Sequence, residues 1–124
     1  MNNRGHIMNT ATFDFDAPDF YKPNLLGGSI EWDVNVSEFE CGCISSFYAV
    51  KMPSRDWDGK LSTTGDSWYY CDSNLLDSLC PEFDFAEANK YSFMTTPHIC
   101  NSPDEHGHYS SCDGAGQCNL NIVN

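Results

Sequence analysis

The stretch 80–87 (CPEFDFAE) places three carboxylates among aromatic side chains. Glu82, Asp84 and Glu87 follow the spacing E-x-D-x-x-E, with a phenylalanine on each side of the aspartate. A buried charge without a partner is costly, so the stretch predicts a strand with a core on one face and a polar cleft on the other. On a regular strand Glu82 and Asp84 share a face, and Glu87 points to the opposite one. A β-bulge between Asp84 and Glu87 would bring all three to one side.

Paired carboxyl groups are the machinery of glycoside hydrolysis, in which one acts as nucleophile and the other as proton donor. A retaining mechanism needs them about 5–5.5 Å apart. On an extended strand the Cα atoms of Glu82 and Glu87 would be roughly 16 Å apart, so the bulge, strand curvature and long side chains must close the gap. Asp84 would then form a hydrogen bond to Glu82 and help set its ionisation. The same spacing also fits a solvated acidic edge.

The rest of the chain predicts an all-β fold, a partial jelly roll or β-sandwich with long disulfide-tied loops. Residues 1–24 are expected to be an irregular N-terminal segment, and residues 25–124 one domain. The alternation of apolar and polar residues and the aromatic runs predict strands at 29–36, 45–52, 68–71 and 80–88. Residues from 95 onward are expected to be mostly loops, and 73–79 is a weak helical candidate.

The net charge of the chain and the length of its apolar runs limit which binding partners are compatible with it. The 124 residues carry a net charge of −12, and the six Lys and Arg residues are scattered, which argues against nucleic acids and anionic membranes. A polysaccharide such as a β-glucan remains compatible. No apolar run reaches the roughly 20 residues that a membrane span needs. Residues 1–6 are polar and show no signal-peptide apolar region.

Seven cysteines in a chain of this size predict a secreted protein or one in another oxidising compartment. Cys100, His106, His108 and Cys112 have residue types that suit Zn²⁺, but their spacing fits no common site. The run 56–59 (DWDG) begins like a calcium loop, yet no acidic residue closes it at the expected distance, so it predicts a turn. We therefore expect neither a metal nor a cofactor.

Six short segments occur in an order that is found in a known enzyme family. They are Asp33-Val34-Asn35-Val36-Ser37 with Cys41-Gly42, Tyr48-x-Val50-x-Met52, Tyr70-Cys71-Asp72-Ser73, Cys80-x-Glu82-x-Asp84-x-x-Glu87-Ala88-Asn89, Thr96-Pro97-His98-x-Cys100, and Cys112-Asp113 to Cys118-Asn119. Through them the chain from about residue 25 to 121 resembles glycoside hydrolase family 7, the fungal-type cellobiohydrolases and endoglucanases. Ala86 and Ile44 depart from the Trp and Asn that are usual in that family.

The resemblance implies a retaining β-1,4-glucanase built on a curved jelly roll with a cellulose cleft. Glu82 matches the nucleophile and Glu87 the general acid/base, while Asp84 matches the assisting carboxylate between them. His98 matches a histidine near the acid/base, although a structural loop histidine fits it as well. Three further residues, which match positions that line the cleft, are Tyr48, Tyr70 and Asp72. Ordinary sheet aromatics would explain the two tyrosines equally well.

The resemblance also implies two disulfides, Cys71–Cys80 and Cys100–Cys112. Cys41 and Cys118 match cysteines whose partners would lie beyond residue 124, and Cys43 has no counterpart. A family catalytic domain is several times longer than this chain, so the expected partners include another protein chain or the remainder of the domain. The competing hypothesis is a non-catalytic structural or glycan-binding subunit of a larger assembly.

Overall fold

A computed structural model describes residues 4–10, 19–62, 69–116 and 120–123 of the chain. The chain forms two units, residues 1–33 and residues 34–124, so the boundary expected after residue 24 lies within the first unit. In that unit Met8 and Phe20 form an isolated β-bridge. The backbone N–H of Asn9 donates to the carbonyl of Asp19 at 2.9 Å, so the bridge joins two short stretches of otherwise irregular chain.

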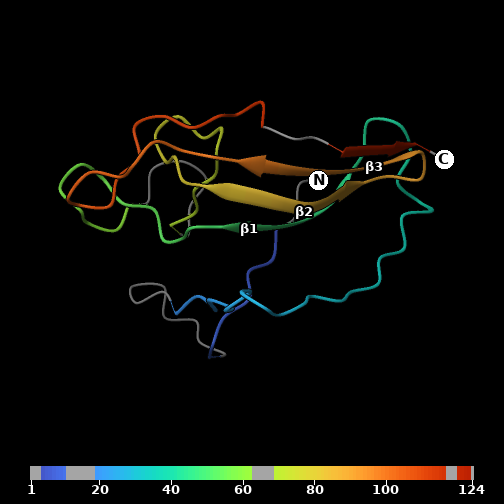
Figure 1. Ribbon diagram of the computed structural model, residues 1–124, viewed down its shortest axis with the longest axis horizontal. Helices are drawn as coiled ribbons and strands as arrows, with labels where there is room; N and C mark the ends of the chain where they lie inside the picture. The colour runs from blue at the N-terminus through green and yellow to red at the C-terminus, as the bar shows by residue number, and fades with distance from the viewer. Residues whose placement is uncertain (1–3, 11–18, 63–68, 117–119, 124) are drawn as a thin grey trace. The chain divides into compact units, whose positions relative to one another are not determined.

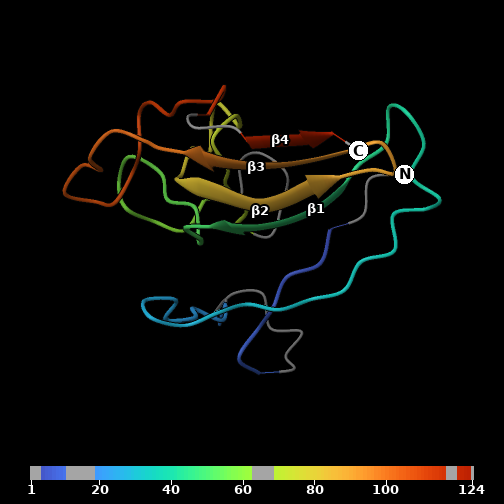
Figure 2. The same cartoon turned by 45° about the vertical axis from the view of Figure 1, so that its right-hand side comes forward.

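The second unit is a four-stranded antiparallel sheet (Figure 1). Its strands are β1 (Ser45–Val50), β2 (Glu82–Ala88), β3 (Ser92–His98) and β4 (Leu120–Val123). They lie side by side in the order β1-β2-β3-β4, as Figure 2 shows. The all-β class is confirmed, and the described residues contain no helix. The described part of the chain holds one sheet, without the second sheet that a sandwich would add.

Two predicted strands are correct and two are wrong. β1 and β2 coincide with the predicted strands at 45–52 and 80–88. Residues 29–36 form no strand despite their alternation, because no neighbouring segment in the described part of the chain pairs with their backbone. Residues 69–71 are also not a strand, and Trp68 lies outside the described residues.

Residues from 95 onward were expected to be mostly loops, and 99–116 form no strand. The strands β3, which extends to His98, and β4 depart from that expectation. Asn89 stabilises the tight turn that returns β2 into β3, because its Oδ1 accepts the backbone N–H groups of Tyr91 and Ser92 at 2.9 and 3.0 Å. The β-branched Thr95 and Thr96 then favour an extended backbone. Pairing with β2, a segment close in sequence, outweighs the turn-like composition of the last 30 residues.

Residues 73–79 form a turn and not a helix. Asp72 Oδ1 accepts the backbone N–H groups of Asn74 and Leu75 at 2.8 and 2.7 Å, and this local bonding competes with a helix. The Cys71–Cys80 disulfide closes the same segment, with Cα atoms 5.5 Å apart. The turn therefore brings residues 72 and 73 to the start of β2.

The core of the unit lies around that disulfide. Cys71, Cys80 and Tyr70 are almost fully buried, at 0, 2 and 3 % exposure. Four serines fill the space beside them. They are Ser54, Ser62, Ser73 and Ser78. Ser78 Oγ donates to the carbonyl of Tyr70 at 3.0 Å, so these small polar side chains pack in the core with hydrogen bonds made locally.

The second disulfide joins Cys100 to Cys112, which removes two of the four ligands of the zinc alternative. Cys41 and Cys43 are free and exposed, and Cys118 lies outside the described residues. Two disulfides in a chain of this size indicate an oxidising compartment. Among the described residues, no helix has the length and apolar character needed to cross a membrane.

Candidate active site

A β-bulge in β2 brings the three carboxylates to one face of the sheet. Between Asp84 and Glu87 the β2 chain advances three residues, while its partner β3 advances two, from Thr96 to Met94. The same three residues face two on β1. The paired residues of β3 are spaced by two and share a face, so the residues opposite them also share it. The predicted bulge is therefore confirmed, and Glu82, Asp84 and Glu87 lie together.

Glu82 is held by the turn that precedes β2. Its Oε2 accepts the backbone N–H of Ser73 at 3.1 Å and the Ser73 hydroxyl at 2.8 Å. Hydrogen bonds to an ionised oxygen are the stronger kind, and these two fix the carboxylate in place. The expected hydrogen bond between Asp84 and Glu82 is absent from this described part of the sheet, because Asp84 bonds to His98 instead.

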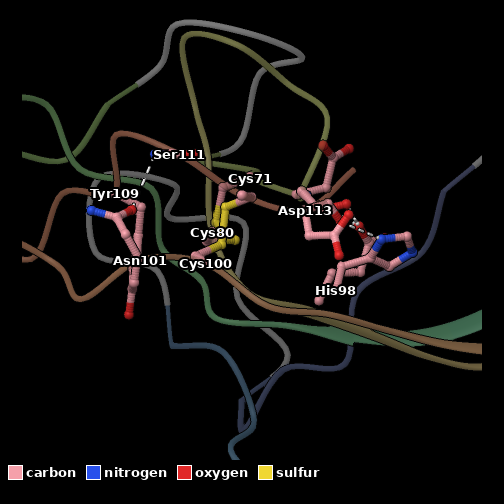
Figure 3. Close-up of a disulfide and its surroundings, with 12 residues drawn as sticks. Cys71, Cys80, His98, Cys100, Asn101, Tyr109, Ser111 and Asp113 are labelled. Atoms are coloured by element: carbon pink, nitrogen blue, oxygen red, sulfur yellow. Dashed lines mark hydrogen bonds between the residues drawn. A yellow bond between two sulfur atoms is a disulfide. The ribbon is translucent and has the colours of Figure 1, made fainter. Parts of the chain in front are cut away.

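Asp84 is paired with His98 across the sheet. Asp84 Oδ2 lies 2.9 Å from His98 Nε2, and both side chains are buried, at 6 and 9 % exposure. His98 Nδ1 lies 2.9 Å from the backbone carbonyl of Asp113, and Figure 3 shows the imidazole directed toward that residue. A carbonyl only accepts, so Nδ1 carries a hydrogen. One proton is then shared between Asp84 and Nε2.

Burial and like charge together disfavour the ionised form of Asp84. Burial, followed by the charges of Glu82 and Glu87, raises the pKa of Asp84 to about 6, against a smaller opposing effect of His98. Burial alone would lower the pKa of His98. The hydrogen bonds to Asp113 and Asp84, with the negative charges of Asp84 and Glu82, outweigh it and leave the His98 pKa raised. Near neutral pH the pair therefore retains its proton more readily than either free side chain.

Because the folded protein holds this proton more tightly than the unfolded chain, we expect the sheet to lose stability as pH rises. An aspartate with a raised folded-state pKa stabilises fully below its unfolded pKa of about 4 and loses that contribution as pH rises through about 6. The raised pKa of His98 acts in the same direction. We expect the free energy of unfolding to fall by about 2 kcal/mol between pH 4 and pH 7 through this pair, measured as urea midpoints.

A matched pair of variants isolates the effect. Asp84→Asn should flatten the pH slope, while Asp58→Asn, whose side chain is 77 % exposed, should leave it unchanged. Equal slopes in the two variants would show that the Asp84–His98 pair does not carry the pH dependence.

The remaining residues predicted for the site lie at the edges of this cluster. Tyr48 pairs with Asp84 in the sheet register, and its hydroxyl lies 3.4 Å from that of Tyr70. Asp72 uses Oδ1 to stabilise the turn at 73–79. The structure therefore groups the four acid/base candidates and Tyr48 on or beside one sheet face, and places Asp72 in the turn that positions Ser73.

Ser73, Asp113 and Gly116 have structural roles that the sequence did not reveal. Ser73 lies in a recognisable segment, but nothing in its spacing marks it as the partner of Glu82. Asp113 acts through its carbonyl, which carries no sequence signal. A Cβ at Gly116 would lie 2.1 Å from Thr96 Cγ2 and 3.0 Å from His98 Cε1, so only glycine allows this loop to cover the histidine.

The same cluster has the residue types of a cation site. One ligand atom each from Glu82, Asp84 and His98 lies within 4.8 Å of the others, which is compatible with a divalent metal. The Asp84–His98 hydrogen bond already uses two of these atoms. The arrangement therefore holds a shared proton at Asp84 and His98 beside the hydrogen-bonded carboxylate of Glu82.

Comparison with known proteins points to fungal glucanases. Probable endo-beta-1,4-glucanase celB of Neosartorya fischeri is 27% identical over 128 residues, which cover 86% of this chain and 31% of that protein. The celB protein of Aspergillus clavatus is 29% identical over 87% of this chain and 31% of its own length. Endoglucanase 1 of Pyricularia oryzae is 26% identical over 74% of this chain and 27% of its own length.

The chain is thus distantly homologous to fungal endo-beta-1,4-glucanases and spans about a third of the length of these relatives. No family model matches the chain, and no solved structure matches it with statistical significance.

Proposed function

We propose that this sheet is the catalytic centre of a secreted retaining β-1,4-glucan hydrolase of the family 7 type. The observation that carries the proposal is the bulge that gathers Glu82, Asp84 and Glu87 on one face. The distant homology to fungal glucanases supports a glucan as substrate. The resemblance of the acidic stretch to the family signature supports the roles of the individual carboxylates.

The proposed reaction has two displacements. In the first, a Glu82 oxygen forms a bond to the anomeric carbon as the bond to the leaving oxygen breaks, and Glu87 gives that oxygen its proton. In the second, Glu87 takes a proton from water, the water oxygen bonds to the anomeric carbon, and the Glu82 carboxylate leaves. Ser73 holds Glu82 in its attacking position. Asp84 shares its proton with His98, so it adds little negative charge beside the nucleophile.

The stereochemistry of the first product tests this function. Two inversions at one carbon amount to retention, so proton NMR of a cello-oligosaccharide digest should show the β-anomer before mutarotation. An α-anomer formed first would contradict the two-step mechanism. Binding of cello-oligosaccharides without any hydrolysis would also contradict it and would favour the second candidate.

That second candidate is a non-catalytic glycan-binding subunit, and the opposite face of the sheet favours it. The rings of Phe83 and Phe85 lie 5.0 Å apart and those of Phe47 and Phe85 lie 5.5 Å apart. Phe83 is 43 % exposed, so this apolar cluster is incompletely covered. Large exposed apolar areas mark interaction surfaces, which is compatible with a place in a larger assembly.

A further inference from the structure

Two loops with the same internal design lie beyond the catalytic end of the sheet. In residues 56–60 (DWDGK), Asp56 Oδ1 accepts the backbone N–H groups of Asp58 and Lys60 at 3.0 and 2.9 Å. In residues 104–108 (DEHGH), Asp104 Oδ1 accepts the corresponding N–H groups, those two and four residues later, each at 2.9 Å. The fourth residue of each loop is a glycine with positive φ, 78° and 83°. Each loop is therefore stiffened by its own aspartate.

The two loops pack against each other through these glycines. A Cβ at Gly59 would lie 3.1 Å from His106 Cβ, and a Cβ at Gly107 would lie 3.4 Å from Arg55 Cδ. Arg55 Nη1 also donates to the Gly59 carbonyl at 2.6 Å. Tyr109, which follows the second loop, is buried and accepts a hydrogen bond from Lys51 at 2.7 Å. The loop pair is thus a fixed feature of the fold.

This loop pair holds an exposed indole. The ring centroids of Trp57 and His108 are 3.7 Å apart with an interplanar angle of 37°. His108 is half-buried with its Nδ1 covered, so the imidazole is partly enclosed and contacts one face of the indole. Trp57 itself is 66 % exposed. An aromatic ring that is held rigidly but left open to solvent is a surface prepared for a flat apolar ligand.

The loop pair lies at the end of the sheet that carries the acid/base cluster. The Trp57 loop follows the end of β1, and the His108 loop follows β3, which ends at His98. Glu82 begins β2 at the same end, because it pairs with both Val50 and His98. Figure 1 shows the two loops side by side beyond this end. The indole and the carboxylates therefore lie at the same end of the sheet.

We propose that Trp57, supported by His108, is a sugar-stacking subsite that binds a glucosyl unit of the same chain that the carboxylates cleave. A pyranose ring presents a flat face of C–H groups to an aromatic ring and hydroxyls at its rim. Exposed carboxylates that could accept from those hydroxyls are present on both loops, at Asp58 and Glu105. A net charge of −12 disfavours an anionic ligand. The subsite rests on the proposed glucan specificity.

The test measures cello-oligosaccharide binding apart from hydrolysis. In the full chain carrying Glu82→Gln, cellotetraose should shift the indole N–H resonance of Trp57. Trp57→Ala in that background should raise the dissociation constant for cellotetraose about tenfold. Trp57→Phe should raise it less. Trp32→Ala removes another exposed indole, from the first unit, and should leave the dissociation constant unchanged.

The outcomes separate the subsite from the catalytic proposal. Equal dissociation constants for Trp57→Ala and Trp32→Ala would overturn the subsite, even if Glu82 proves essential for hydrolysis. A Trp57-dependent affinity in a protein that hydrolyses nothing would support the subsite and overturn the catalytic role. A change of oligomeric state in Trp57→Ala, without a change in cellotetraose affinity, would assign the indole to a protein interface and overturn the subsite.

Discussion

Glu82→Gln is expected to lower the rate of aryl β-cellobioside hydrolysis roughly 10⁴-fold or more, as expected when an enzyme loses its nucleophile. An amide does not attack the anomeric carbon, so the covalent step is lost. The amide oxygen can still accept the hydrogen bonds that Ser73 gives to the carboxylate, so the fold should survive. Initial rates of aryl release measure the effect.

The matched control is Glu38→Gln, which removes an equal charge at an exposed site in the same unit. Its rate should equal that of the unaltered protein. If the Glu82 and Glu38 variants hydrolyse at the same rate, Glu82 is not the nucleophile.

Glu87→Gln is expected to lower hydrolysis about 10²- to 10⁴-fold on substrates with a poor leaving group, because general acid–base catalysis contributes that much. A 2,4-dinitrophenyl leaving group needs no protonation, so the first step should be nearly unaffected with that substrate. The second step, which needs a base to activate water, then becomes slow. The values of kcat/KM for two aryl cellobiosides of different leaving-group acidity report the first step and measure this difference.

Added azide provides a control for the role of Glu87. Azide attacks the glycosyl enzyme without base assistance, so it should restore turnover of the dinitrophenyl substrate and yield the β-glycosyl azide. An equal loss of rate on both substrates, without recovery in azide, would contradict the assignment of Glu87 as acid/base.

Strands β1 and β2 could be predicted from the sequence because the pattern that marks them lies within each segment. Alternation with period two identifies β1 and β2, and the odd spacing from Asp84 to Glu87 requires the bulge once the three acids share a face. The same rule fails at 29–36, because an alternating segment forms a strand only when a neighbour pairs with it. β3 was missed for the converse reason. It contains Pro97, but pairing with β2 overrides its weak pattern.

The candidate site was also only partly predictable from the sequence. Ionisable side chains, such as Glu82 and His98, could be named from the sequence and its resemblance to a family. The groups that position them could not. Ser73 is one of many serines, and Asp113 contributes a backbone carbonyl. The twin loops were predicted only as a turn at 56–59, because the packing of Gly59 against His106 joins segments 47 residues apart.

The most direct measurement is the identity of the residue that carries the sugar during turnover. A 2-deoxy-2-fluoro cellobioside with a dinitrophenyl leaving group should accumulate as a covalent glycosyl ester, because the fluorine slows the second displacement. Peptide mapping by mass spectrometry is predicted to find the label on Glu82, the carboxylate held by Ser73. A label on Glu87, or steady hydrolysis with no labelled peptide, would contradict the proposed catalytic sheet.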